Sequence, residues 1–169
     1  MTLAAQTTAL VVEDRLSTEP LAVHAHYTRD EVLGAIGAAT PEKPPTVREG
    51  VVWAAEANAD VFFVTLRKSD KTFSATTMYH DYAISPTEFH WESQSTTSIA
   101  SRTGQRYINH AGRGSRVLLL AREVPEQRDF LYLGPAQYVR HSGDRPISIT
   151  WRLDCELPPL FFLEARAVS

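Results

Sequence analysis

The feature that most constrains the fold is a series of short segments with β-strand character and no regular helix between them. The clearest is residues 146–153, where Ile147, Ile149 and Trp151 alternate with polar residues, which is the period of a strand with one buried face. A nearly continuous apolar run at residues 116–124 predicts a central strand that is covered on both faces. Strand–helix–strand units are missing, so a parallel sheet is not expected.

Further strands are predicted where branched and aromatic residues dominate a short segment. These segments are residues 50–53, 60–67, 89–92, 130–133 and 137–141. We therefore expect an α+β, mainly β domain, which is a curved antiparallel sheet or a small barrel with one or two short helices.

One helix is predicted at residues 29–36. Thr28 has the side-chain oxygen of an N-cap, Glu31 completes a capping box three residues later, and Gly37 follows the last turn. Residues 1–26 are expected to form an N-terminal arm or an edge strand. Residues 27–169 are expected to form a single β-rich domain.

The overall composition excludes several classes of protein. The net charge of −3 argues against a protein that coats nucleic acid by charge alone. The single cysteine, Cys155, excludes an intramolecular disulfide and a cysteine-cluster zinc site. No apolar run approaches the roughly 20 residues that span a bilayer. We therefore expect a cytoplasmic protein that does not enter a membrane.

Positive charge is concentrated in residues 100–116, which contain four arginines and no acidic residue. Such a cluster indicates either a phosphate-facing surface or a solvated loop with scattered arginines. On the first interpretation, we predict phosphate contacts from this cluster and from two residues that follow the predicted strand at residues 60–67. They are Lys68, Ser69, Arg102, Arg106 and Arg113.

A polar segment, residues 68–110, is too rich in aromatic residues to be disordered, and loops of this length are usually functional. Rings that stack on bases, beside amides and carboxylates that read base edges, are typical of nucleic-acid sites. The predicted base-binding residues are Tyr79, Asp81, Tyr82, Trp91, Ser93, Gln94 and Tyr107. Core packing of Trp91 and a turn capped by Asp81 are the structural alternatives.

Catalysis is not expected from this sequence. It contains neither a glycine-rich phosphate loop nor a G-x-S-x-G motif. Its acidic and histidine side chains in the polar segment match no zinc spacing. These side chains are His80, Asp81, His90, Glu92 and His110. We therefore predict no catalytic residues, no metal and no cofactor, and a binding module in place of an enzyme.

Long blocks of the sequence resemble an uncharacterised bacterial domain found at the C-terminus of DEAD/DEAH-box helicase and phospholipase-D-like nuclease proteins. The resemblance covers residues 27–157. The blocks are REG (48–50), FFVTLRKSDKTFSATTMYHDYAIS (62–85), FHWESQSTTS (89–98), TGQRYINH (103–110) and LGPAQYV (133–139). It implies a helicase or nuclease effector, in cis or in trans, in a restriction-type or phage-defence system.

The polar and aromatic blocks also resemble PUA-like barrels that accept a flipped, modified base. This resemblance implies a reader of double-stranded DNA that recognises modified cytosine. Two alternatives stay open. One is DNA binding by shape, or by an altered backbone such as phosphorothioate, without base readout. The other is a docking module for a helicase or nuclease with residues 160–163 as an exposed apolar patch, although we expect these residues to close the core as a last strand.

Overall fold

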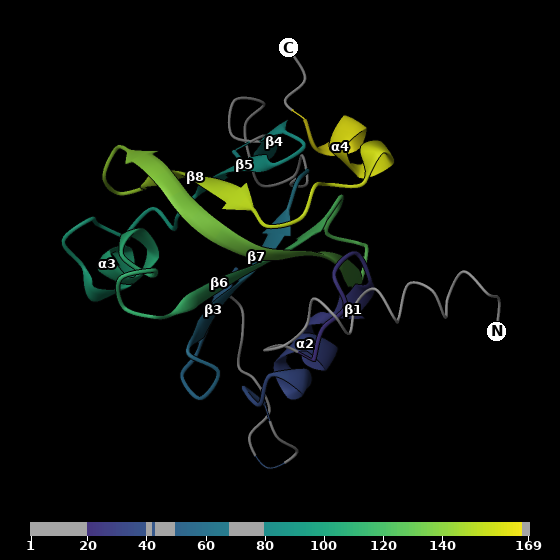
Figure 1. Ribbon diagram of the computed structural model, residues 1–169, viewed down its shortest axis with the longest axis horizontal. Coiled ribbons are helices and arrows are strands. Elements are labelled where there is room, and N and C mark those ends of the chain that lie inside the picture. The colour runs from purple at the N-terminus through teal and green to yellow at the C-terminus, as the bar shows by residue number, and fades with distance from the viewer. Residues whose placement is uncertain (1–19, 40–41, 43–49, 68–79, 167–169) are drawn as a thin grey trace, which may run out of the picture.

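A single curved sheet of eight strands forms most of the computed structural model, which describes residues 20–39, 42, 50–67 and 80–166 (Figure 1). Three short helices surround the sheet in these residues, so the expected α+β, mainly β class is confirmed. In the view of Figure 1, α2 and α4 lie on opposite sides of the long strand β7, and α3 lies beside its far end.

The strands follow the order β2-β3-β6-β7-β8-β5-β4, and β1 pairs with β7. Their bounds are β1 (His26–Thr28), β2 (Val51–Ala54), β3 (Ala59–Thr65), β4 (Tyr82–Ser85), β5 (Glu88–Glu92), β6 (Arg116–Arg122), β7 (Asp129–Ser142) and β8 (Ser148–Leu153). All neighbours are antiparallel except β3 and β6, which are parallel. This parallel pair departs from the antiparallel expectation. The connection between its two strands includes β4, β5 and α3 and is not one compact crossover helix.

The inner face of the sheet carries an aromatic core. On β5, Phe89 and Trp91 are buried there, whereas His90 and Glu92 on the opposite face are partly exposed. The rings of Phe62 on β3 and Trp91 on β5 lie 4.3 Å apart, although these strands stand near opposite ends of the strand order. The sheet therefore curls until its ends approach. No ladder joins β2 to β5 among the described strands, so a seam remains between them.

The curvature is centred on β7, the middle strand of the order. Its pairing with β6 shifts register between Leu119 and Leu120, opposite Gly134. Gly134 has a φ of +99°, a conformation that glycine adopts without strain. A second shift against β8 lies between Tyr138 and Arg140. Such bulges bend a strand and increase its twist, so β7 is one continuous bent strand where two separate strands were expected.

The outer face of the sheet is covered by α2 (Arg29–Ala35), close to the predicted bounds. Its capping box is present, because the Thr28 N–H donates to Glu31 Oε1 at 3.0 Å and the Glu31 N–H donates to Thr28 Oγ1 at 3.2 Å. Val32 and Leu33 pack against this face together with Leu21. The packed domain therefore includes residues before Tyr27.

The helix α3 (Arg102–Ile108) lies in a segment that the sequence analysis left as a polar loop. Ser101 caps it, because its Oγ accepts the Gly104 N–H at 3.0 Å. Gly104 packs directly on the Ser98 carbonyl oxygen, where a Cβ atom would collide with it. Tyr107 then reaches the aromatic core. The segment is therefore folded onto the sheet.

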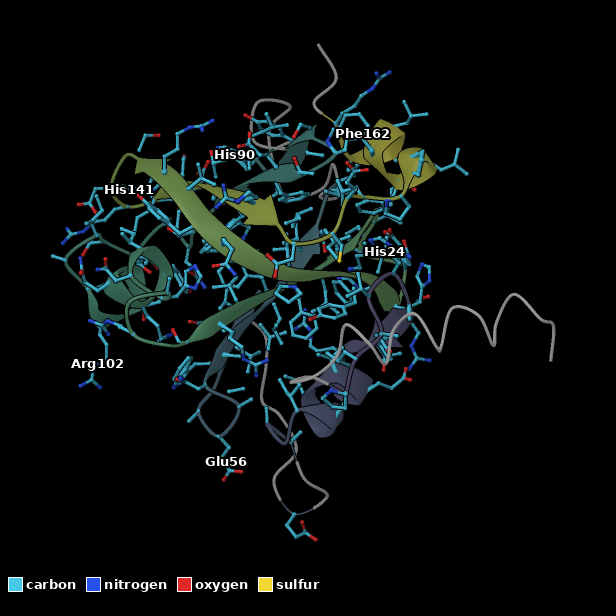
Figure 2. The ribbon with its side chains drawn as sticks, in the orientation of Figure 1. His24, Glu56, His90, Arg102, His141 and Phe162 are labelled. Atoms are coloured by element: carbon cyan, nitrogen blue, oxygen red, sulfur yellow. The ribbon has the colours of Figure 1, made fainter. Side chains whose placement is uncertain are left out.

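Residues 160–163 belong to the helix α4 (Pro159–Ala165), so the expected last strand is wrong. Proline is favoured at the first helical position because its missing N–H has no partner there in any case. Phe161 and Phe162 pack against the inner core, whereas Leu160 and Leu163 are 77% and 52% exposed. Figure 2 labels Phe162 on this helix. In the described part of the chain no helix has the length and apolar character to cross a membrane.

Candidate nucleic-acid interface

A cavity of about 340 Å³ opens at the seam of the sheet. We call it the seam cavity. Its lining comes from the β2–β3 end of the sheet, from the end of β5, and from the first residue of α2 and the last of β6. These residues are Arg29, Gly50, Val51, Phe63, Val64, Thr65, Asp81, Trp91, Glu92, Ser93, Gln94 and Arg122. Its volume lies at the small end of the range of about 300–1,000 Å³ that is typical of ligand pockets.

Four of the predicted base-binding residues line this cavity, namely Asp81, Trp91, Ser93 and Gln94. Asp81 is buried, and its Oδ1 accepts the Glu92 N–H at 2.9 Å. This bond fixes the carboxylate at the end of β5. A carboxylate has about four acceptor sites, so Asp81 can accept a further hydrogen bond from an amine in the cavity.

Ser93 and Gln94 have different roles at the same wall. The Ser93 hydroxyl is used inside the fold, because its Oγ accepts the Ile147 N–H at 2.8 Å and donates to Gln94 O at 3.1 Å. Gln94 uses its side-chain oxygen, which accepts from Thr97 Oγ1 at 3.1 Å. The Gln94 amide nitrogen can only donate. An acceptor at Asp81 and a donor at Gln94 together can read the edge of a base.

The predicted stacking rings are placed less favourably. Trp91 and Tyr107 contact each other edge-on at 5.4 Å in the aromatic core, and Tyr107 is 1% exposed. A ring that is covered in this way offers no face to an incoming base, so we reassign Tyr107 to the core, and Trp91, which is 5% exposed, packs in the core and forms part of the cavity wall. Tyr82 stacks on His90 at 4.6 Å, outside the lining of the seam cavity. Tyr79, Lys68 and Ser69 lie outside the described residues.

Of the predicted phosphate contacts, Arg106 is held by the fold. Its Nε and Nη2 donate to the two carboxylate oxygens of Asp60 at 2.7 and 2.9 Å, and its guanidinium lies 4.4 Å from the Trp53 ring centroid. Burial raises the pKa of the Asp60 carboxyl, and the Arg106 hydrogen bonds oppose that rise. We therefore reassign Arg106 from phosphate binding to the junction of α3 and β3. Arg102 and Arg113 are exposed, and Figure 2 shows Arg102 pointing outward from α3.

Comparison with protein families gives one match, over residues 21–164. The chain belongs to the DUF3427 family. The family is described as a domain of unknown function. The match begins at Leu21, which is fully buried in the outer core of this DUF3427 domain. Among curated proteins, none matches the chain.

The fold of the DUF3427 domain is similar to part of a plant protein. The crystal structure of SUVH6 from Arabidopsis thaliana in complex with SAM matches with a TM-score of 0.51 and 8% identity. The match covers 97% of the DUF3427 chain and 34% of the SUVH6 chain. The DUF3427 chain thus spans about a third of that chain, and the similarity supports the expected PUA-like β-rich fold.

A cavity larger than the seam cavity lies elsewhere in the described part of the DUF3427 domain. It measures about 590 Å³ and is lined by Val23, His24, Pro135, Asp154, Cys155 and Glu156. Two carboxylates and no lysine or arginine line it, so it suits a phosphate-bearing ligand less well than the seam cavity does. Its size alone therefore does not make it the candidate site.

Three charged residues of the seam cavity were not among the site residues predicted from the sequence. Glu92 lies on the partly exposed face of β5 and pairs with His80, whose Nδ1 is 2.9 Å from Glu92 Oε2. Arg29 and Arg122 come from α2 and β6. The one available signal was the charge of Arg122 at the end of a strand whose interior residues are apolar. Within the described residues, no three His, Cys, Asp or Glu side chains gather as a metal site.

His110, which the sequence placed in the basic cluster, is buried in the DUF3427 domain. Its Nδ1–H donates to Ser115 O at 3.3 Å, and its Nε2 accepts the Tyr138 N–H at 3.0 Å. This arrangement needs the neutral imidazole, because a proton on Nε2 would face another donor. Burial lowers the pKa of His110, although the Ser115 bond and the Asp60 charge act in the opposite direction.

The buried neutral imidazole predicts that acid destabilises the domain. Because the pKa of His110 is lower in the folded chain than in the unfolded chain, unfolding takes up a proton as the pH falls. Above about pH 6.5, we expect the free energy of unfolding to keep its full contribution from neutral His110. As the pH is lowered further, the free energy of unfolding should fall by up to about 1.4 kcal/mol per pH unit until the pKa of His110 in the folded chain is passed. Urea unfolding between pH 5 and 8 measures this slope.

The matched variants are His110→Gln, which removes the titrating group, and His141→Gln, which changes an exposed histidine. We expect His110→Gln to flatten the slope and His141→Gln to keep it. Equal slopes in the wild-type chain and His110→Gln would contradict this assignment.

Proposed function

We propose that this DUF3427 domain is a DNA-binding reader that accepts a base, flipped out of the duplex, in the seam cavity. The observation that carries the proposal is the convergence of Asp81, Trp91, Ser93 and Gln94 on one cavity between the two ends of the sheet. Extruding a base costs a few kcal/mol, and a cavity with fixed polar groups can repay that cost.

The polar groups favour a base that carries an exocyclic amine. Asp81 supplies an acceptor for the amine, and the Gln94 amide nitrogen supplies a donor for a ring nitrogen or carbonyl next to it. Cytosine presents this combination on its Watson–Crick edge. Apolar walls from Val51, Phe63 and Trp91 can surround the ring and a substituent on it. Modified cytosine is therefore the proposed target.

We further propose that the domain binds double-stranded DNA as a binding module and not as an enzyme. The exposed Arg102 and Arg113 on and after α3 remain the proposed contacts to flanking phosphates. The resemblance to domains attached to helicases and phospholipase-D-like nucleases supports an effector of that kind, in cis or in trans. The proposed setting is a restriction or phage-defence system.

A panel of labelled duplexes tests the proposal. The panel contains unmodified DNA, DNA with 5-methylcytosine or 5-hydroxymethylcytosine, and a phosphorothioate duplex of the same sequence. We expect one cytosine-modified duplex to bind the full chain about tenfold or more tighter than the unmodified one, the size of one good base contact. Equal binding with a steep salt dependence supports shape or backbone recognition instead. Absent binding at low salt rejects the reader altogether.

A second candidate function is docking on a helicase or nuclease. It is favoured by the exposure of Leu160 and Leu163 on α4, since adjacent exposed leucines often mark a contact surface. A chain that ignores every duplex in the panel but binds a purified DEAD/DEAH-box helicase through α4 would support this candidate over the reader.

A further inference from the structure

Two arginines that the sequence analysis did not select meet at the seam cavity. Arg29 is the first residue of α2 and Arg122 is the last residue of β6, and both line the cavity. Their guanidinium groups flank the same ring: Arg122 lies 4.5 Å and Arg29 5.9 Å from the Phe130 ring centroid. Arg29 is also 4.8 Å from the Phe63 ring centroid. Both cations thus lie near the same aromatic ring.

The hydrogen bonds of Arg122 position its guanidinium without neutralising it. Its Nε donates to Thr65 Oγ1 at 3.0 Å and its Nη1 donates to Gln127 O at 2.7 Å. Both acceptors are uncharged. These bonds use two of the five N–H donors of the guanidinium. Within the described residues, no carboxylate forms an ion pair with Arg122, in contrast to the pairs of Arg67 with Glu123 and Arg106 with Asp60.

The charge of Arg29 acts on the guanidinium of Arg122. Burial lowers the pKa of Arg122, the neighbouring Arg29 charge lowers it further, and Glu126 opposes both. Arginine nevertheless stays protonated in proteins. Planar guanidinium groups bind phosphate oxygens in pairs, so an anion that contacts Arg122 and Arg29 would offset the effect of the Arg29 charge on Arg122.

We propose that Arg29 and Arg122 bind a phosphate of the DNA strand whose base enters the seam cavity. This inference rests on the proposed reader function and extends it. The cavity then has an acceptor and a donor for the base at Asp81 and Gln94, and two cations for the phosphate next to it. This site is distinct from the exposed arginines of α3. It fixes the strand at the point where the base leaves the stack.

The test compares Arg122→Gln with Arg67→Gln, which removes the same charge from an exposed arginine that is paired with Glu123. We expect Arg122→Gln to weaken duplex binding by at least about tenfold. We also expect it to reduce the slope of log affinity against log salt by about 0.9, the loss of one phosphate contact. The preference for modified DNA should persist, because phosphate contacts carry no base information. Arg67→Gln should change neither quantity by a comparable amount.

A second measurement needs no substitution. Inorganic phosphate is added to the wild-type chain, and the Nε–H resonance of Arg122 is followed by NMR. We expect this resonance to shift in a saturable way, with no comparable shift for Arg67. Phosphate binding without any duplex binding would keep the anion site and reject the reader. An unshifted Arg122 resonance, or an unchanged salt slope in a folded Arg122→Gln chain that still prefers modified DNA, would reject the phosphate site and keep the reader.

Discussion

Replacing Arg106 with methionine is expected to lower the free energy of unfolding by about 3–5 kcal/mol, because it leaves a buried carboxylate without its partner. Asp60 is 0% exposed, and both of its oxygens accept from Arg106. Burial already raises the pKa of Asp60, and the variant loses the Arg106 hydrogen bonds and charge that oppose this rise. Chemical denaturation of the full chain at neutral pH measures the loss.

The exposed pair of Arg67 and Glu123 provides the matched control, since both of its side chains are more than a third exposed. Arg67→Met should lower the free energy of unfolding by no more than about 1 kcal/mol, as is usual for a surface ion pair. The double variant Asp60→Asn with Arg106→Met should recover part of the stability that the single variant loses. A loss from Arg106→Met no larger than that from Arg67→Met would show that Asp60 and Arg106 do not form a buried ion pair.

Replacing Asp81 with asparagine is expected to weaken binding of the preferred modified duplex by about 10- to 100-fold, the range for a lost hydrogen bond to a charged group. The change is nearly isosteric, and the asparagine oxygen can still accept the Glu92 N–H that Asp81 accepts at 2.9 Å. Its amide nitrogen, however, would present a donor to the cytosine amine. Unmodified and modified duplexes should therefore bind with similar, weak affinity. Fluorescence anisotropy on both duplexes measures the effect.

Asp144→Asn makes the same chemical change outside the seam cavity, where Asp144 is exposed and accepts the Ile99 N–H at 2.7 Å. It should bind both duplexes as the wild-type chain does. If Asp81→Asn remains folded and keeps the wild-type preference, then Asp81 does not read the base. The proposed orientation of the base in the cavity would then be incorrect.

Six of the eight described strands could be predicted from the sequence because their side chains alternate or form apolar or aromatic runs, whereas β1 and β4 were not predicted. The same local signal is ambiguous at residues 160–163, where four apolar residues suit a strand or a helix equally well. Pro158 and Pro159, which precede them, are the residues that favour the helix. The helix α3 was missed because it depends on the close packing of Gly104 against the Ser98 carbonyl oxygen. Such a contact leaves no periodic pattern in the sequence.

The candidate site could be predicted only in part. One wall of the seam cavity comes from a single segment of the chain that contains Asp81, Ser93 and Gln94. The composition of that segment was therefore enough to predict these three residues as part of the site. The pairing of Arg106 with Asp60 joins residues 46 positions apart in the chain, and no local pattern encodes it. Arg29 and Arg122 likewise come together only because α2 and β6 meet over Phe130.

The bulge at Gly134 has a consequence for how ligand size is controlled in this fold. The seam cavity lies between the two ends of a curled sheet, so the distance between its walls depends on how tightly the middle of the sheet bends. Gly134 does not line that cavity. Relatives with the same lining residues but a different bend in the central strand would therefore accept ligands of different widths. In this architecture, specificity is shared between the side chains that contact the ligand and a backbone position remote from it.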